Sequence, residues 1–172
     1  NKLVDAWNDT EGQVLFYGEE LALTPFFRLS NGCTRDGKEV LGSDAYPYLK
    51  IVECPWDIED KKQIQTVMTE DMDAEITQAD TAGYVLSVRV GQENLSGEEF
   101  RSTYGLASGC FTLQRYNGQI RITTRGEGHG LGMSQYSADQ MAKEGETYDA
   151  ILQYFYEGTE IKEVAEILLD VE

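Results

Sequence analysis

The sequence predicts an α+β fold, with a mostly antiparallel twisted sheet packed against two helices near the carboxyl end of the chain. Short apolar runs separated by turn residues occupy much of the first two thirds, as is typical of antiparallel strands. Asn117-Gly118 lies between two such runs and is a characteristic hairpin signal. Helical periodicity is concentrated after about residue 134. This distribution favours α+β over a fold built from parallel β-α-β units.

The first third of the chain is typical of β-structure. Apolar runs over 14–17 and 21–29 are separated by the turn residues Gly18-Glu19. A segment dense in turn formers follows over 30–37 and predicts a surface loop. Residues 46–52 predict another strand, which ends before Cys54-Pro55.

The middle third is more polar, and we expect residues 56–106 to form a peripheral lobe. Its predicted elements are a strand over 64–69, a short helix over about 70–76 and a strand over 84–90. Ser96 and Glu99 form a capping-box pattern that predicts one or two helical turns, ending at Gly105. The predicted hairpin strands are 111–116 and 119–124.

Two helices are predicted in the last third. The first runs over about 134–143, with Gly145 just past its end. Thr147 can cap the second, where apolar residues recur at i, i+3, i+4 and i+7 from Tyr148. The tail from Ile161 onward fits either a strand or a short helix.

Composition limits the classes of function. The 172 residues correspond to one domain, and 41% of them are hydrophobic, enough for a real core. Acidic residues outnumber basic ones 31 to 14, for a formal net charge of -17. Nucleic acid is therefore not an expected partner, because its binding rests on Lys and Arg neutralising phosphates. No apolar run approaches the roughly 18 residues of a membrane span.

The cysteines leave two interpretations open. Cys33, Cys54 and Cys110 lack Cys-x-x-Cys spacing, and His129 is the only histidine, so we expect no zinc site and no cofactor. The three cysteines are either one disulfide plus a free thiol, or three buried small apolar side chains. If a disulfide forms, Cys33 and Cys54 are the first choice, because a loop and a strand end beside one sheet could meet.

The most unusual segment is residues 124–136. It contains four glycines at alternate positions, 126, 128, 130 and 132, which indicate sharp bends or close approach of another molecule. His129 lies in its middle and could bind a ligand or bridge loops structurally. Ser134 lies at a predicted helix start, where it could be only a cap. The spacing fits neither a dinucleotide fingerprint nor a nucleophile elbow.

An ordered set of motifs extends from this segment. The pattern G-x-G-H-G-L-G-M-S-Q-Y is followed by Ala138, Met141-Ala142, Gly145, Tyr148, Ile151-Leu152, Tyr154, Tyr156 and Gly158-Thr159. Upstream are Thr10-x-Gly12, Ser30-x-Gly32-x-Thr34, Pro47-Tyr48-Leu49, Val52, Pro55-x-Asp57, Arg101, Leu106, Ser108 and Phe111. Together these motifs, over most of residues 10–160, resemble the stage II sporulation protein D (SpoIID/LytB) family. One glycine of the family's S-x-G-G-x-T loop is replaced here.

The resemblance implies an extracytoplasmic, wall-facing bacterial lytic transglycosylase that cuts peptidoglycan glycan strands. Its preferred strands are those stripped of stem peptides by a partner amidase. The reaction needs one carboxylic acid, which protonates the glycosidic oxygen and then takes a proton from the sugar's 6-hydroxyl, giving an anhydro product.

The family places this glutamate in a helical segment before the T-x-G strand, which begins here at Thr10. We therefore expect residues 1–172 to be one domain of this type without its N-terminal catalytic segment, which would be a partner for this chain. No catalytic residue is expected within it. Glu127 is the nearest carboxylate to His129, but it fills a position that the family leaves variable.

The residues that we expect in the glycan cleft are His129, Gly130, Ser134 and Gln135, with Ser30 and Thr34 from an opposite loop. Hydroxyl, amide and imidazole groups over closely approaching backbone suit a neutral sugar. The alternative is a non-catalytic cell-wall-binding or spore-associated module that kept the scaffold and lost the acid.

Overall fold

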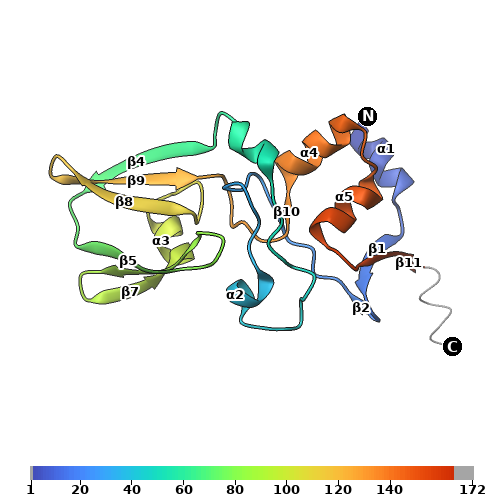
Figure 1. Cartoon of the computed structure of the whole chain (residues 1–172), viewed down its shortest axis with the longest axis horizontal. Coiled ribbons are helices and arrows are strands. Elements are labelled where there is room, and N and C mark those ends of the chain that lie inside the picture. Colours follow the sequence, from blue (N-terminus) through green and yellow to red (C-terminus); the bar gives the residue numbers. More distant parts are fainter. Residues whose placement is uncertain (1, 165–172) are drawn as a thin grey trace.

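The computed structural model describes residues 2–164, which form an elongated molecule with a strand-rich half and a mixed half (Figure 1). In chain order the elements are α1 (Lys2–Asp9), β1 (Gln13–Tyr17), β2 (Glu20–Leu21), β3 (Phe26–Phe27), α2 (Gly37–Leu41), the 3₁₀ helix η1 (Pro55–Glu59), β4 (Ile64–Glu70), β5 (Ala74–Ala79), β6 (Val85–Val90), β7 (Glu93–Ser96), α3 (Gly97–Thr103), β8 (Phe111–Tyr116), β9 (Gln119–Arg125), β10 (Met133–Ser134), α4 (Gln135–Glu144), α5 (Tyr148–Phe155) and β11 (Glu160–Glu163).

The α+β class and the prevalence of antiparallel pairing are confirmed, but the strands are divided among small sheets. The described strands form three antiparallel sheets, β11-β1-β2, β4-β9-β8 and β5-β6-β7, and one short parallel pair, β10-β3. The chain leaves β9 at the glycine-rich segment, where the four alternate glycines all have positive φ. Since a regular strand requires negative φ, the sheet cannot continue through this segment.

The strand-rich half contains the β4-β9-β8 and β5-β6-β7 sheets, with α3 between them (Figure 1). Phe100 of α3 is fully buried there and stacks on Phe111 of β8, with ring centroids 5.2 Å apart. The aliphatic side chains of the two sheets complete this core. Most of residues 56–106 lie in this half, together with the β8–β9 hairpin.

The mixed half contains α1, α4 and α5 beside the β11-β1-β2 sheet (Figure 1). Its core joins α4 and α5 to the segment before η1 and includes Tyr48, Leu49, Cys54, Leu131, Met141, Ile151, Phe155 and Tyr156. The two carboxyl-terminal helices are therefore confirmed. The tail begins as strand β11, and the part of the tail prediction beyond residue 164 lies outside the described residues.

Local sequence signals predicted several elements correctly. Asn117 and Gly118 have φ of 51° and 72° and connect β8 to β9, as their hairpin signal indicated. Ser96 and Glu99 form a complete capping box at the start of α3. Gly145 ends α4 in the left-handed conformation.

Two element predictions were wrong. Residues 70–76 are not helical. Glu70 completes β4, which pairs with the distant strand β9, and Ala74 begins β5, which forms a hairpin with β6. Residues 46–52 are not a strand, because their backbone bonds to the preceding loop are isolated and do not form a continuous ladder: Thr34 N donates to Val52 O at 2.9 Å, and Gly37 N donates to Leu49 O at 2.7 Å. The Thr34 hydroxyl accepts a hydrogen bond from Val52 N and donates one to Lys50 O, both at 2.8 Å.

Cys33 and Cys54, the first choice if a disulfide forms, are not joined, and the three cysteines are free thiols. Cys33 forms an antiparallel bridge with Glu53, so Cys54 is the neighbour of its partner. Adjacent residues in extended backbone point to opposite faces, which separates the two sulfur atoms. Burial raises the pKa of the Cys54 thiol to about 12, so this sulfur stays protonated.

Among residues 2–164, no helix has both the length and the apolar character needed to cross a membrane.

Candidate functional site

The glycine-rich segment lies between the two halves and is bonded through its backbone to loops from both. Glu127 exchanges two hydrogen bonds with Leu29, Gly128 N donates to Ala107 O at 2.8 Å, and Arg35 N donates to Gly130 O at 2.9 Å. Two stretches far apart in the sequence, residues 29–35 and the turn at Ala107, therefore converge on this segment.

Close approach explains two of these glycines. A Cβ on Gly132 would overlap the carbonyl oxygen of Pro25, and a Cβ on Gly130 would overlap the ring of Tyr84. Both residues also have φ of 81°, which strains any other residue type. The group that approaches these two glycines is therefore part of the protein itself: a backbone carbonyl at Gly132 and an aromatic ring at Gly130.

His129 is half-buried and held on several sides. Its Nδ1 accepts a 3.2 Å hydrogen bond from Leu131 N, and its ring lies 5.7 Å from that of Phe27. Burial lowers the pKa of His129 below 6.5, while a hydrogen bond to the backbone of Phe26 acts in the opposite direction. The neutral imidazole with an unprotonated Nδ1 fits this arrangement. This geometry gives His129 a loop-bridging role.

Arg35 and Asp80 support the backbone of His129 and were missed by sequence reasoning. Arg35 Nη1 donates to His129 O at 3.0 Å, and its Nε donates to Asp80 at 2.5 Å. Asp80 also accepts a 2.8 Å hydrogen bond from Tyr84 N, and the Arg35 guanidinium lies over the Tyr84 ring. Arg35 directly follows the motif residue Thr34, but its partner Asp80 lies 45 residues away, and no sequence spacing indicates that pair.

Asp57 connects the buried hydroxyl groups of the site. It is fully buried in η1 and accepts hydrogen bonds from Ser30 N at 2.6 Å, Ser134 Oγ at 2.7 Å and Ser137 Oγ at 2.6 Å. Ser134 is also the N-cap of α4. The carboxylate therefore fixes the start of α4 against the loop at Ser30.

The six residues expected in a glycan cleft divide into two groups. Ser30, Thr34 and Ser134 have no exposed surface, and their hydroxyls bond within the protein. We expected these three residues to line an open cleft, but their hydroxyls hold the surrounding loops together instead. Gly130 is buried, His129 is half-buried and Gln135 is exposed at the start of α4. Side-chain contact with a ligand is thus open to His129 and Gln135.

Glu127, the alternative carboxylate, is half-buried. Its Oε2 forms no hydrogen bond and lies 3.7 Å from Lys62 Nζ, a distance that permits ion pairing. Among the residues that the structure describes, no group of His, Cys, Asp and Glu side chains could hold a metal ion.

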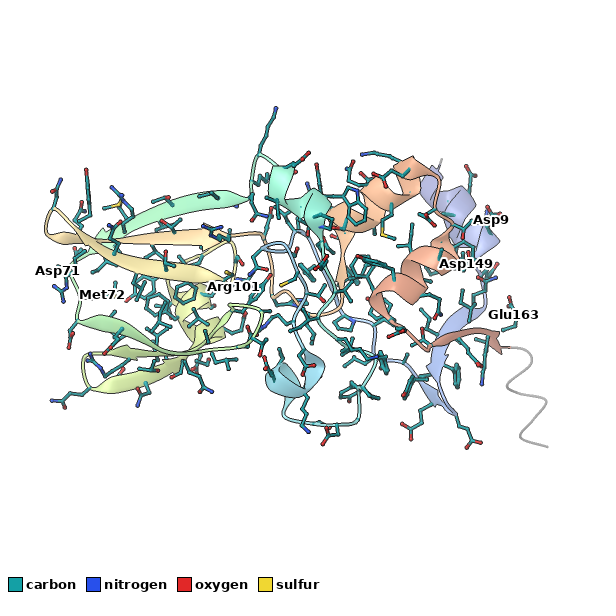
Figure 2. All side chains as sticks on the ribbon, viewed as in Figure 1. Asp9, Asp71, Met72, Arg101, Asp149 and Glu163 are labelled. Atoms are coloured by element: carbon teal, nitrogen blue, oxygen red, sulfur yellow. The ribbon has the colours of Figure 1, made fainter. Side chains whose placement is uncertain are left out.

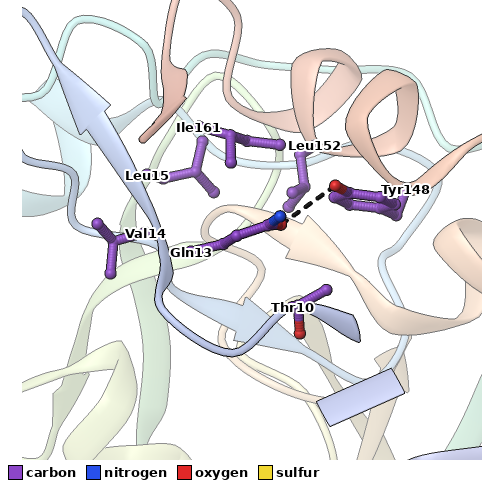
Figure 3. Close-up of a pocket in the computed structure, with 7 residues that line it drawn as sticks. All are labelled: Thr10, Gln13, Val14, Leu15, Tyr148, Leu152 and Ile161. Atoms are coloured by element: carbon purple, nitrogen blue, oxygen red, sulfur yellow. Dashed lines mark hydrogen bonds between the residues drawn. The ribbon is translucent and has the colours of Figure 1, made fainter. Parts of the chain in front are cut away.

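Two of the hollows on the described surface are relevant to ligand binding. One, of about 450 Å³, is polar and lies on α3 and the turn after it. The other, of about 200 Å³, lies between β1, β11 and α5 (Figure 3). It is mainly apolar, and Tyr148 Oη donates a 3.1 Å hydrogen bond to Gln13 Oε1 at its edge (Figure 3). Neither hollow has a residue of the glycine-rich segment in its lining.

Comparison with known proteins gives the family. No family model matches the chain. The chain is 37% identical over 177 residues to Stage II sporulation protein D of Bacillus subtilis (strain 168), covering 94% of this chain and 51% of that protein. It is 33% identical over 182 residues to Stage II sporulation protein D of Bacillus amyloliquefaciens, covering 97% of this chain and 53% of that protein.

A shorter match is 40% identical over 60 residues to the amidase enhancer of Bacillus subtilis (strain 168), covering 35% of this chain and 8% of that protein. The chain spans about half the length of the two sporulation proteins. Because both are similar to it over nearly its whole extent, the chain belongs to the stage II sporulation protein D family.

Proposed function

We propose that the intact protein is a peptidoglycan lytic transglycosylase of the sporulation type, and that this chain supplies the scaffold of its glycan-binding cleft. The observation that carries the proposal is the 37% identity to a Stage II sporulation protein D over 94% of the chain. The protein would act outside the cytoplasm, facing the cell wall.

The surface around the glycine-rich segment suits a neutral sugar. Gln135 offers an exposed amide, and His129, six residues before it, offers a half-buried imidazole. The buried Asp57 network fixes the start of α4, and therefore fixes Gln135, against the loops. With a net charge of -17, the chain should favour strands without stem peptides, since these carry less negative charge than intact peptidoglycan.

The chemistry requires a carboxylic acid that first donates and then accepts a proton. We assign this acid to the part of the intact protein that this chain does not include. Within the chain, the carboxylate of Glu127 lies near Lys62, and its backbone is paired with Leu29. Neither feature directs it toward a bound glycosidic oxygen.

A cell-wall amidase is the proposed partner, because it would supply strands without stem peptides. The similarity of 60 residues to a protein named amidase enhancer supports a functional link to such enzymes.

A non-catalytic wall-binding or spore-associated module is the second candidate. Glu98 lies close enough to His129 to affect its pKa, and it pairs with Arg101. Glu127, two residues before His129 in sequence, lies beside Lys62. Paired carboxylates of this kind suit binding better than proton transfer, and this observation favours the second candidate if the intact protein has no further acid.

Glycan binding by the chain tests the scaffold role directly. The chain is titrated with peptide-free glycan strands and, in parallel, with intact peptidoglycan, and we expect tighter binding to the former. Gln135→Ala should weaken binding about threefold to tenfold, since it removes one exposed amide. Gln140→Ala, on the same helix, is the matched control and should bind like the wild type. Absence of binding to both polymers would contradict the scaffold role.

A further inference from the structure

The polar hollow on α3 has a fixed lining. It is lined by Glu98, Arg101, Ser102, Gly105 and Leu106 and has a volume of about 450 Å³. Arg101 Nη1 donates a 3.0 Å hydrogen bond to Glu98 Oε2. The same guanidinium donates to Leu106 O and to Ala107 O, each at 3.2 Å. The charged pair is therefore held in place by the turn that follows α3.

This hollow adjoins the glycine-rich segment. Ala107 O accepts a 2.8 Å hydrogen bond from Gly128 N, and Ser108 forms a parallel bridge with Gly128. Glu98 and Arg101 lie close enough to His129 to affect its pKa in opposite directions. Figure 2 shows Arg101 at the inner end of the strand-rich half, well away from the tip at Asp71 and Met72.

The lining indicates the class of ligand. Glu98 supplies an acceptor and Arg101 supplies donors, and because they are paired they add no net charge. Their side chains are 53% and 25% exposed, so hydrogen-bonding capacity remains at the surface. Ser102 adds an exposed hydroxyl, and Leu106 provides an apolar contact. A sugar ring matches such a lining, because its hydroxyls both donate and accept hydrogen bonds and its ring has an apolar face. A simple anion does not match it, because the Glu98 carboxylate would repel it.

Size and access are consistent with one or two sugar rings. Ligand pockets commonly enclose about 300–1,000 Å³, and this hollow lies within that range. Gly105 leaves its rim open, since a Cβ there would meet no atom within 4 Å.

We propose that the hollow on α3 is a saccharide subsite that extends the glycan-binding surface beyond His129. This inference rests on the proposed function, because it names where a second part of the same strand binds. It assigns Glu98 and Ser102 to substrate recognition and Arg101 to holding the Glu98 carboxylate in position.

The test is titration of the full chain with chitotetraose, in which calorimetry measures the affinity and backbone amide NMR locates the binding site. The wild type should show amide shifts at Ser102, Gly105 and Leu106. Ser102→Trp fills the hollow from an exposed position and should weaken binding about tenfold. Thr103→Trp adds the same bulk at the next exposed position of α3, outside the hollow, and should leave the affinity unchanged.

Glu98→Gln provides a second variant that adds no bulk, and it should weaken binding severalfold by removing the charged acceptor. If the wild type binds chitotetraose while both variants match Thr103→Trp, the subsite is overturned and the proposed function stands. If the wild-type chain does not bind at all, the proposed function and the subsite are both overturned. If Ser102→Trp and Glu98→Gln bind chitotetraose more weakly while Thr103→Trp keeps the wild-type affinity, the subsite is supported.

Discussion

Ser134 donates a 2.7 Å hydrogen bond to Asp57, although the two residues are 77 positions apart in the chain. Asp57 is fully buried in η1, and Ser134 caps α4, so the bond fixes one helix start to a distant turn. Ser137 and the backbone of Ser30 donate to the same carboxylate. The position of the glycine-rich segment, which enters α4 through Ser134, therefore depends on Asp57.

Asp57→Ala should destabilise the fold strongly. It leaves two hydroxyls and one backbone N–H without their acceptor in a buried site, for a loss of roughly 3–5 kcal/mol in the free energy of unfolding. Urea unfolding measures the loss. Asp44→Asn is the control, since its side chain is 80% exposed and pairs only with Lys38, and it should change stability by less than about 0.5 kcal/mol. Equal effects of the two variants would contradict the role of Asp57.

Arg35 and Asp80 should be energetically coupled. Arg35→Met leaves the buried Asp80 carboxylate without its cation, and we expect a loss of roughly 3–5 kcal/mol. In Arg35→Met/Asp80→Asn the uncompensated charge is gone, so the double variant should lose less than the sum of the single losses. A double-mutant cycle by urea unfolding measures this coupling. Simple additivity would show that the pair does not act as a unit.

Gly132→Ala should be far more disruptive than Gly118→Ala. Both residues have positive φ, of 81° and 72°, so both substitutions strain the backbone by about 1 kcal/mol. At Gly132 the added Cβ also overlaps Pro25 O, whereas at Gly118 it meets nothing within 4 Å. The thermal midpoint of Gly132→Ala should therefore fall well below that of Gly118→Ala, and similar midpoints would contradict the close approach.

His129 should make stability depend on pH. Its pKa in the folded state lies below the 6.5 of an unperturbed histidine, mainly because of burial. The unfolded chain then binds the proton more readily, so stability is fully present above about pH 6.5 and declines as the pH falls toward the folded-state value.

The measurement is urea unfolding of the wild type and of His129→Asn at about pH 7.5 and about pH 5.5. The stability advantage of the wild type should shrink at the lower pH. Carboxylates titrate in both proteins and cancel in this comparison. An advantage that is constant or larger at the lower pH would contradict the lowered pKa.

Sequence reasoning succeeded where structure is determined locally. The Asn117-Gly118 hairpin and the Ser96–Glu99 capping box each depend on residues within four positions of one another. The helix from Tyr148 similarly follows from a periodic apolar face. These features need no knowledge of what the segment packs against.

Long-range contacts decided the rest. Residues 46–52 bond to Thr34 and Gly37 without forming a regular strand, and Glu70 completes β4 because the distant strand β9 pairs with it. Residues 74–76 belong to β5, which forms a local hairpin with β6. The glycine-rich segment was identified as special from its sequence, but the burial of Ser134 was not, because its partner Asp57 carries no recognisable spacing. Arg35 and Asp80 were missed for the same reason.

The most direct test of the central claim compares this chain with the intact protein. Each is incubated with peptide-free glycan strands, and anhydro-ended products are sought by mass spectrometry. The intact protein should form them, and the chain alone should not, because loss of general acid–base catalysis lowers the rate by about 10²–10⁴-fold. Product from neither would favour the non-catalytic module. Robust product from the chain alone would contradict the account and direct attention to Glu127 or another carboxylate within it.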